Sequence, residues 1–227
     1  MKIIAMILAA GFGSRLKPLT DKIPKPLIKI GNETIIERHL RNLKKAKIKN
    51  VIINVSHHAE KIIEEIGNGS NYGLEITYSH ERDRPLETLG GILNALRFFK
   101  EANNLLVINS DIWCDYNLQN ISVPTNGNKA HLILVPNKNE ENPEGDFGIR
   151  ESKLNLSDNI KYTYSGLSCI KLNSLKSLTV RYNKLGQLYR DWAINEFLSG
   201  EVYYGNWIDV GTHERLKEAR SLVKNQT

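Results

Sequence analysis

The 227-residue chain has too few cysteines for a fold built on disulfides or structural zinc. It contains only Cys114 and Cys169, and it has no CxxC pair, so a disulfide scaffold and a zinc ribbon are both excluded. Glycine and proline number 16 and 7, which is far too few for a collagen-like or low-complexity chain. We expect both thiols to be small buried side chains rather than nucleophiles.

A long hydrophobic run is also missing. The longest, Ile3–Ala10, has eight residues, whereas about 20 are needed to span a bilayer. This run follows Lys2, as a signal peptide would, but Gly11 and Gly13 come next in place of a convincing cleavage site. We therefore expect a cytoplasmic protein that does not bind a membrane.

Charge of one sign is in modest excess. The 31 Lys and Arg residues against 25 Asp and Glu residues give a net charge of +6. That excess suits an anionic small substrate, a nucleic acid or a merely basic surface. The chain lacks the interleaved aromatic residues and basic stripe of an RNA reader. We expect small-molecule substrates and no nucleic acid, with a non-enzymatic nucleotide-sensing or RNA-binding module as the alternative.

Apolar segments and helical stripes alternate through the first half of the chain. Strands are predicted at 3–10, 51–55, 74–78 and 105–108, and helices at 34–46, 58–66 and 89–99. Thr34 and Glu37 have the spacing of a capping box at the first helix. Such alternation predicts an α/β fold of Rossmann-like type, with three αβα layers around a mostly parallel mixed sheet.

The second half is less regular. Strands are predicted at 132–135, 162–171 and 207–210, and helices at 185–197 and at 213–224, where Thr212 is the expected cap. Prolines and glycines predict loops at 15–33 and 136–146. There is no internal repeat and no clear linker, so we expect one domain over residues 1–227.

A glycine-rich turn, Ala10-Gly11-Phe12-Gly13-Ser14-Arg15, follows the first strand. In parallel sheets, ligands bind beyond the carboxyl ends of the strands. Gly11 and Gly13 let backbone N–H groups approach a phosphate, and Arg15 can pair with another phosphate. Leu16 replaces the third glycine of a Rossmann fingerprint, and no P-loop sequence follows. The turn therefore predicts a phosphate cradle of neither common type, with a simple tight strand exit as the alternative.

Two further segments carry groups that suit a nucleotide. Pro24 and Pro26 fix the backbone around Lys25, whose ammonium can then meet an anionic oxygen. Pro85–Gly91 leads into the 89–99 helix, where glycines leave N–H donors and room for a flat base. The alternatives are a solvated loop lysine and an ordinary junction between a loop and a helix.

Two aspartates each end a short apolar segment. Asp111 closes Asn109-Ser110-Asp111 after the fourth strand, and Asp209 follows Trp207-Ile208. Mg²⁺ takes one or two carboxylates and completes its octahedron with phosphate and water. We expect this pair to hold Mg²⁺ if the two strand ends meet; the alternative for each residue is a cap or a turn.

Together these segments resemble the signature of the sugar-1-phosphate nucleotidylyltransferases. The resemblance runs from Leu8–Thr20 and Pro24–Leu27 through Pro85–Gly91 and Asn109–Asp111 to Asp209–Thr212. It implies in-line attack of a sugar 1-phosphate on the α-phosphorus of a nucleoside triphosphate, with pyrophosphate leaving. Catalysis would then rest on positioning and charge neutralisation. From the length of 227 residues we expect no extra C-terminal domain of the kind that longer members carry.

The resemblance also implies roles for matching residues. It assigns catalysis to Arg15 and Lys25; nucleotide binding to Ala10, Gly11, Gly13, Arg15, Glu87, Gly90 and Asn109; sugar binding to Asn109, Asp146, Ser165 and Gly166; and Mg²⁺ binding to Asp111 and Asp209. Residues 1–116 would form a nucleotide-binding half and residues 117–227 a sugar-binding half. Leu89 stands where similar proteins have glycine or alanine, and we expect it to narrow the space near the base.

Four segments bear on the substrates. Residues 85–88, 145–147, 164–166 and 205–212 look most like the N-acetylmuramate 1-phosphate uridylyltransferases of cell-wall (peptidoglycan) recycling. This similarity implies UTP and N-acetylmuramate 1-phosphate. A heptose or mannose 1-phosphate guanylyltransferase and a choline-phosphate cytidylyltransferase are the alternatives, and Pro26 disfavours the last because the choline type has alanine there. We expect a monomer or a small homo-oligomer.

Overall fold

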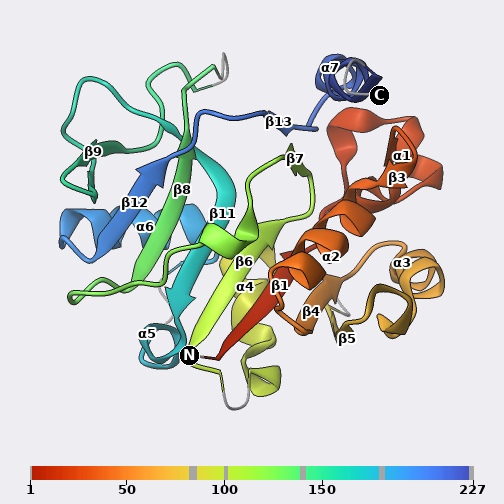
Figure 1. Cartoon of the computed structure of the whole chain (residues 1–227), viewed down its shortest axis with the longest axis horizontal. Helices are drawn as coiled ribbons and strands as arrows, with labels where there is room; N and C mark the ends of the chain where they lie inside the picture. The colour runs from red at the N-terminus through yellow and green to blue at the C-terminus, as the bar shows by residue number, and fades with distance from the viewer. Residues whose placement is uncertain (1, 82–85, 100–101, 139–141, 179–181, 225–227) are drawn as a thin grey trace.

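The computed structural model describes residues 2–81, 86–99, 102–138, 142–178 and 182–224. Its centre is a nine-stranded sheet with helices on both faces (Figure 1). The strand order is β5 (Glu75–His80), β4 (Asn50–Val55), β1 (Ile3–Leu8), β6 (Asn104–Asn109), β11 (Thr163–Lys171), β8 (Ala130–Val135), β12 (Leu198–Val202), β10 (Lys153–Asn155) and β9 (Gly148–Arg150).

The direction of the strands changes along this sheet. Strands β5, β4, β1 and β6 are parallel, whereas β11 runs antiparallel to both of its neighbours, β6 and β8. Beyond them, β12 is parallel to β8, and β10 and β9 form an antiparallel edge. The predicted α/β class with a mixed sheet is confirmed, and one sheet runs through both halves of the chain.

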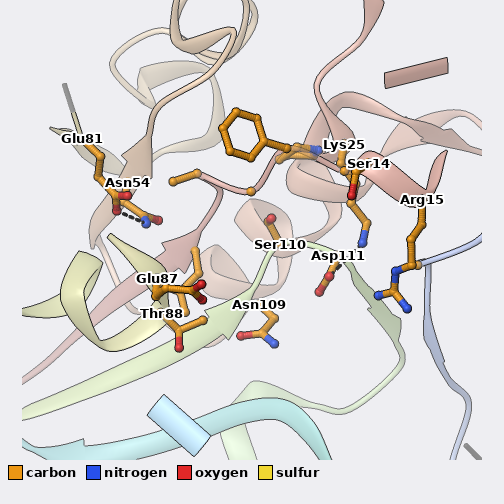
Figure 2. A pocket seen from close by; sticks show the side chains of 17 residues that line it. Ser14, Arg15, Lys25, Asn54, Glu81, Glu87, Thr88, Asn109, Ser110 and Asp111 are labelled. Atoms are coloured by element: carbon orange, nitrogen blue, oxygen red, sulfur yellow. Dashed lines mark hydrogen bonds and ion pairs between the residues drawn. The ribbon is translucent and has the colours of Figure 1, made fainter. Parts of the chain in front are cut away.

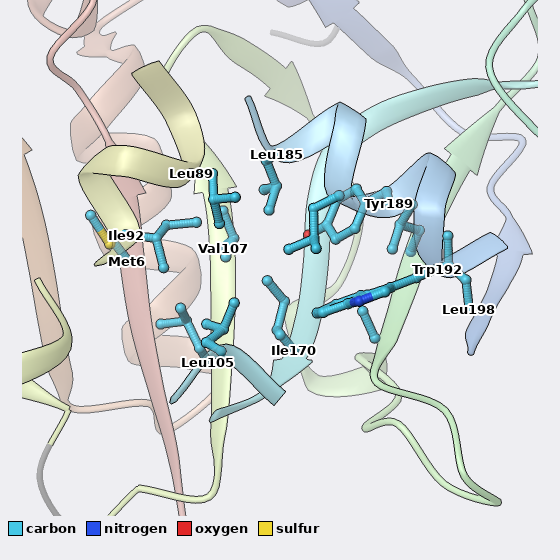
Figure 3. Close-up of a cluster of buried hydrophobic side chains, with 14 of the residues drawn as sticks. Met6, Leu89, Ile92, Leu105, Val107, Ile170, Leu185, Tyr189, Trp192 and Leu198 are labelled. Atoms are coloured by element: carbon cyan, nitrogen blue, oxygen red, sulfur yellow. The ribbon is translucent and has the colours of Figure 1, made fainter. Parts of the chain in front are cut away.

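Both faces of the sheet are buried, which explains the unbroken apolar run of β1. Ala5 and Ile7 pack with α2 (Ile35–Lys45) and α3 (Ala59–Ile66). Ile4 and Met6 point to the opposite face, because successive strand residues alternate. That face is covered by α4 (Glu87–Asn94), α5 (Leu172–Lys176) and α6 (Leu185–Ile194) (Figure 3).

Leu89 corrects one expectation from the sequence. Its side chain is only 2% exposed and lies in the core with Met6, Val107 and Leu185 (Figure 3). It therefore does not narrow the space near a base. The helical stripe that contains Leu89 faces the sheet, and a larger apolar residue there adds to the core instead.

Two predicted helix starts have the expected caps. The Glu37 backbone N–H donates to Thr34 Oγ1 at 3.2 Å, and Thr34 N–H donates to Glu37 Oε2 at 2.8 Å, which completes a capping box. At the last helix, α7 (His213–Lys224), the Arg215 N–H donates to Thr212 Oγ1 at 3.3 Å. Both caps confirm the prediction from sequence.

Several short elements escaped prediction. Residues 15–33, expected as loop, contain η1 (Ser14–Leu16), α1 (Leu19–Lys22), η2 (Lys25–Leu27) and β2 (Lys29–Ile30), and β2 pairs with β3 (Glu33–Thr34). Other short elements are η3 (Ser70–Tyr72), β7 (Ile112–Cys114) and η5 (Leu118–Asn120), and η4 (Leu96–Phe98) falls within the helix predicted at 89–99. Elements of two to four residues are too short to show a hydrophobic period.

The C-terminal segment returns to the N-terminal loops. Strand β13 (Trp207–Asp209) pairs with β7, and α7 then packs beside the 15–33 segment (Figure 1). Arg220 Nε donates to the carbonyl oxygen of Lys29 at 3.2 Å, and Val223 sits against Gly31. This return brings Asp209 and Gly211 to the end of β1, about 200 residues later in the chain.

Candidate active site

A cavity of about 490 Å³ opens beyond the carboxyl ends of β1 and β6 (Figure 2). This position is the one expected for ligands of an open α/β sheet. The predicted site residues that line it are Ala10, Gly11, Gly13, Arg15, Lys25, Glu87, Asn109 and Asp111. They come from the glycine-rich turn, η2, the start of α4 and the end of β6, so distant parts of the chain share one cavity.

The two glycines of the turn are required for different reasons. Gly13 has a φ of +64°, and a Cβ there would lie 2.9 Å from Thr20 Cγ2, so only glycine fits its backbone. A Cβ on Gly11 would meet nothing within 4 Å. Gly11 is therefore free of packing constraints, and its missing side chain leaves cavity space in which a ligand can approach the backbone.

Lys25 and Asp111 form an ion pair inside the cavity. Lys25 Nζ lies 2.8 Å from Asp111 Oδ2, and the lysine side chain is only 12% exposed. Pro24 and Pro26 hold the turn that carries Lys25, as the sequence predicts. The ammonium is therefore held beside the glycine-rich turn and not extended into solvent.

The β7–β13 pair brings the second aspartate to the first. Asp209 lies opposite Ile112, and Val210 N–H donates to the carbonyl oxygen of Asp111 at 2.8 Å. Arg215 Nη1 donates to Asp209 Oδ2 at 3.0 Å. Burial and the negative charge of Asp111 raise the pKa of Asp209, while neighbouring cations act in the opposite direction. The predicted meeting of the two strand ends is present.

Asp209 Oδ1 provides the test for Mg²⁺. This oxygen is buried and has no hydrogen-bond partner. Within the described ranges, no group of three or more His, Cys, Asp and Glu side chains could hold a metal ion. A cation that takes one or two carboxylates and fills its shell with phosphate and water fits this arrangement, and Mg²⁺ is such a cation. The residues present therefore fit the predicted ion.

The start of α4 differs from expectation. The N–H groups of Leu89 and Gly90 were expected to be open to a ligand, but both donate to the carbonyl oxygen of Asn183, at 2.9 and 3.2 Å. That interpretation is wrong because the segment before α6 folds back over α4, where Leu185 N–H also donates to Thr88 Oγ1. Pro85, the first residue of this motif, lies outside the described residues.

Glu87 lines the cavity in a strained backbone conformation, and Gly90 does not line it. Glu87 has a φ of +62°, a region that non-glycine residues rarely adopt. Such a conformation persists only where surrounding contacts impose it, and it is typical of functional sites. Glu87 and Thr88 are the residues that α4 presents to the cavity (Figure 2).

The residues predicted on the sugar side divide into two sets. Asn109 lines the cavity, and Gly166 packs against it: a Cβ on Gly166 would lie 2.9 Å from Asn109 Cβ. Ser165 is buried, and its hydroxyl accepts from Leu167 N–H at 3.2 Å. Asp146 Oδ2 accepts from Tyr164 N–H at 2.9 Å. Ser165 and Asp146 thus hold the bulged part of β11 and do not line this cavity.

Sequence reasoning missed two polar residues in the cavity wall, Asn54 and Glu81. Asn54 lies near the end of β4, and Glu81 directly follows β5. A usable signal was present, since a polar residue inside an apolar strand and a carboxylate after the next strand both mark carboxyl ends of parallel strands. The ends of the first and fourth strands are more polar, and the prediction from sequence rests on those two.

The two cysteine thiols are buried. Burial raises the pKa of Cys114 to about 11 and that of Cys169 to about 12, so both thiols stay protonated near neutral pH, as expected for inert core residues. Across the part of the chain that the structure describes, no helix has the length and apolar character needed to cross a membrane.

Known proteins are similar to this chain in sequence and in fold. Residues 4–161 match a family model described as Nucleotidyl transferase. An N-acetylmuramate alpha-1-phosphate uridylyltransferase of Neisseria meningitidis is 36% identical, and the match covers 96% of this chain and 97% of that protein. A mannose-1-phosphate guanyltransferase of Yarrowia lipolytica is 35% identical, but the matched part of this chain spans only 60% of its length.

A solved structure agrees on the fold. It is that of a Bacillus anthracis protein with a provisional assignment as a glucose-1-phosphate thymidylyltransferase, in complex with a sucrose. It superposes with a TM-score of 0.83 at 21% identity, over 98% of this chain and 96% of that one. At this level of identity the likeness establishes the shared architecture, and the chemistry must be argued from the cavity.

Proposed function

The chain belongs to the nucleotidyl transferase family, and we propose that it joins UTP to N-acetylmuramate 1-phosphate with release of pyrophosphate. Sugar-1-phosphate nucleotidyltransferase activity is common to its similar proteins. The choice of UTP and of this sugar is supported by the Neisseria meningitidis relative, whose match extends over nearly the whole of both chains. The corresponding physiological setting is recycling of cell-wall sugars in the cytoplasm.

One observation carries the proposal. The glycine-rich turn, the largely buried Lys25 and Asp111 line one cavity, and β13 brings Asp209 beside Asp111, although these groups are separated by up to about 200 residues. Phosphoryl transfer needs little covalent chemistry from the protein, and positioning with charge neutralisation supplies most of the catalysis. These groups provide both, so the whole of residues 1–227 would act as one catalytic domain.

Arg15 and Lys25 would neutralise the reacting phosphates. The attacking sugar phosphate and the α-phosphate are both anionic and repel one another as they approach. Lys25, held at 2.8 Å from Asp111, presents one ammonium at the cavity wall, and Arg15 lies near the Gly211 backbone. The N–H groups of Gly11 and Gly13 would bind further phosphate oxygens. The negative charge that builds up between the two phosphates is then shared with fixed cations.

Asp111 and Asp209 would hold Mg²⁺ together with substrate phosphate oxygens. When bound, the ion withdraws charge from the phosphoryl oxygens and so favours attack. Arg215 keeps Asp209 Oδ2 occupied, which leaves Asp209 Oδ1 turned toward the Gly211 side of the strand. The chain's own part is to hold two carboxylates at a fixed spacing beside Lys25.

The remaining cavity residues would divide between base and sugar. Ala10 and Glu87 would lie toward the nucleoside, and Asn109, with Gly166 packed against it, toward the sugar. Gly90, predicted to bind the nucleotide, does not line the cavity, and its N–H donates to the carbonyl oxygen of Asn183. Asp146 and Ser165 would shape the sugar side through β11. Residues 1–116 thus supply most of the nucleotide contacts, and residues 117–227 complete the sugar side. We propose a monomer or a small homo-oligomer.

A second candidate function is the same reaction with GTP and mannose 1-phosphate as substrates. It is favoured by the Yarrowia lipolytica relative, which is 35% identical. Pyrophosphate release across the four nucleoside triphosphates and a set of sugar 1-phosphates separates the two candidate functions. We expect the largest kcat/KM for UTP with N-acetylmuramate 1-phosphate. A preference for GTP with mannose 1-phosphate would favour the second candidate function, and no release from any pair would contradict both.

A further inference from the structure

Asn54 and Glu81 form a buried polar pair in the wall of the cavity, at the end away from Lys25 and Asp111 (Figure 2). The residues are 3% and 4% exposed. A carboxylate at this depth is costly unless its oxygens are hydrogen-bonded. Neither residue has a role in the phosphate chemistry described above, and the side chains of both are hydrogen-bonded to one another and to backbone N–H groups.

The pair connects two backbone segments through three hydrogen bonds in a row. Ala9 N–H donates to Asn54 Oδ1 at 2.8 Å, and Asn54 Nδ2 donates to Glu81 Oε1 at 2.8 Å. The second carboxylate oxygen, Glu81 Oε2, accepts from Leu86 N–H at 2.7 Å. A buried row of this kind fixes the spacing of the segments at its two ends.

Both ends of this row adjoin residues that face the ligand space. Ala9 directly precedes Ala10 and the glycine-rich turn, and Leu86 directly precedes Glu87 with its positive φ. The row also passes against the backbone of α4: a Cβ on Gly91 would lie 2.6 Å from Glu81 Oε1. The turn after β1 and the start of α4 are therefore held at one separation, with the cavity between them.

The order of donors and acceptors in the row is fully determined. Its two ends, at Ala9 and Leu86, are both donors, so the side chains between them must supply one more acceptor than two amides can. One carboxylate and one amide meet this requirement. With glutamine at position 81, two amides lie between two donors, and a donor must face a donor whichever way the amides turn. With aspartate at position 54 alone, two carboxylates would face one another.

We propose that Asn54 and Glu81 are positioning residues for the nucleoside triphosphate, which set the width of the nucleoside end of the cavity. This inference rests on the proposed nucleotidyl transfer but not on the identity of the sugar. The pair acts through the backbone of Ala9–Ala10 and Leu86–Glu87 and does not take part in the reaction. Either position can carry the carboxylate, provided that the other carries the amide.

The test is an exchange of the two side-chain types. Glu81→Gln and Asn54→Asp are each expected to raise the KM for UTP at least about tenfold, because a tenfold change needs only ~1.4 kcal/mol. The KM for the sugar 1-phosphate should change less than about threefold in both. The double variant Asn54→Asp/Glu81→Gln restores every hydrogen bond of the row, since the new glutamine accepts from Leu86 and donates to the new aspartate. Its KM for UTP should return to within about threefold of wild type.

Asn94→Ala is the matched control. Asn94 Nδ2 bonds Ser79 Oγ at 3.1 Å and the carbonyl oxygen of His80 at 3.3 Å, so it also ties α4 to β5, but it does not line the cavity. This variant should lose thermal stability and keep its KM for UTP. Equal rises of the KM for UTP in the control and in Glu81→Gln would reduce the pair to a merely structural role and overturn the proposal.

Two further outcomes are decisive. If the KM for UTP of the double variant rises as far as the two single changes combined, the two side chains do not act through one shared row of hydrogen bonds. If a single variant fails to fold, the double variant decides alone: a KM for UTP close to wild type supports the pair, and a raised KM overturns it. The rise in melting temperature caused by UTP in the absence of any sugar phosphate also measures the affinity for UTP. That binding assay separates failure of this inference from failure to find the sugar substrate.

Discussion

The two ends of the cavity differ in the interactions that hold their side chains. The charged end contains Arg15, Lys25 and Asp111, with a Lys25–Asp111 ion pair at 2.8 Å. Beside it on β13, Asp209 has a buried oxygen without a hydrogen-bond partner. The amide end contains Asn54 and Glu81, whose three hydrogen bonds are all formed without a ligand. The charged end is thus completed by what binds there, and the amide end is complete in the protein itself.

This difference indicates that the two ends of the cavity affect different kinetic constants. Groups that gain partners only when charge develops in the transition state change kcat, and groups that shape a binding space change KM. The charged end should therefore control turnover, while the amide end should control the affinity for the nucleotide. Substitutions confined to one end at a time test this assignment, and the largest effect is expected at the charged end.

Asp111→Asn removes one carboxylate of the charged end and leaves Lys25 without its ionic partner. We expect kcat to fall at least about 100-fold, measured as pyrophosphate release. A titration of the apoprotein with Mg²⁺, followed by calorimetry in the presence of UTP, should show weaker metal binding. Asp115→Asn is the control, because Asp115 pairs with Tyr203 and Asn206 and does not line the cavity. Equal losses in both variants would count against the metal role of Asp111.

His39 is buried close enough to Asp111 to interact with its charge. It is 3% exposed and hydrogen-bonds the backbone at Ile112, and burial lowers its pKa to about 4. Because the unfolded chain binds this proton near its usual pKa of 6.5, the unfolded state holds more protons between about pH 6.5 and pH 4. Stability should therefore fall as pH drops through that window, by at most ~3 kcal/mol.

Urea unfolding at a series of pH values checks this expectation. The acid-induced loss should shrink in His39→Gln, a variant without a group that titrates there. A loss of stability of the same size in that variant would assign the effect to other residues. Cavity residues are not changed in this experiment, so it measures the support of the charged end separately from its chemistry.

Arg215→Met removes the partner of Asp209 Oδ2. The carboxylate would then be free to turn, and we expect a loss of about tenfold in apparent Mg²⁺ affinity, at the low end for residues that orient metal ligands. The concentration of Mg²⁺ at half-maximal activity and direct calorimetric binding should both shift. Arg220→Met is the control, since Arg220 lies on the same helix and bonds the Lys29 carbonyl. If the two variants need the same Mg²⁺ concentration, Arg215 does not position Asp209.

The two glycines of the turn should separate stability from binding, with the smallest effects. Gly13→Ala forces a φ of +64° on alanine and a contact of 2.9 Å with Thr20, so it should cost ~1–2 kcal/mol of stability. Gly11→Ala meets open space and should leave stability unchanged while it raises the KM for UTP. Thermal melts and initial rates test both. Unaltered binding by Gly11→Ala would mean that no ligand approaches that backbone.

The parallel half of the fold could be predicted well because its signals are local. The strand at 3–8, the capped helix that follows Thr34 and the strand at 104–109 each carry a period or a cap that the sequence displays. In the second half, β9, β10 and β12 are short, and their pairing depends on partners far along the chain. No local pattern encodes such pairing, and these strands were missed.

The site shows the same contrast between local sequence signals and contacts with distant residues. The sequence identified Gly11, Gly13, Arg15, Lys25 and Asp111 as candidates, and all line one cavity. It could not show that the N–H groups of Leu89 and Gly90 are engaged, because their acceptor belongs to Asn183, about 90 residues later. Asn54 and Glu81 each carry the signal of a polar residue at a strand end, but only their hydrogen bond, made across two strands, shows that they form a pair.

The division of labour between the two ends is tested most directly by steady-state kinetics on two variants side by side. The measurement is kcat and the KM for UTP in Asp111→Asn and in Glu81→Gln, with N-acetylmuramate 1-phosphate as the acceptor. We expect Asp111→Asn to lower kcat far more than it changes the KM for UTP. We expect Glu81→Gln to raise the KM for UTP and to leave kcat nearly unchanged. If both variants changed the same constant by similar factors, the two ends would not act separately.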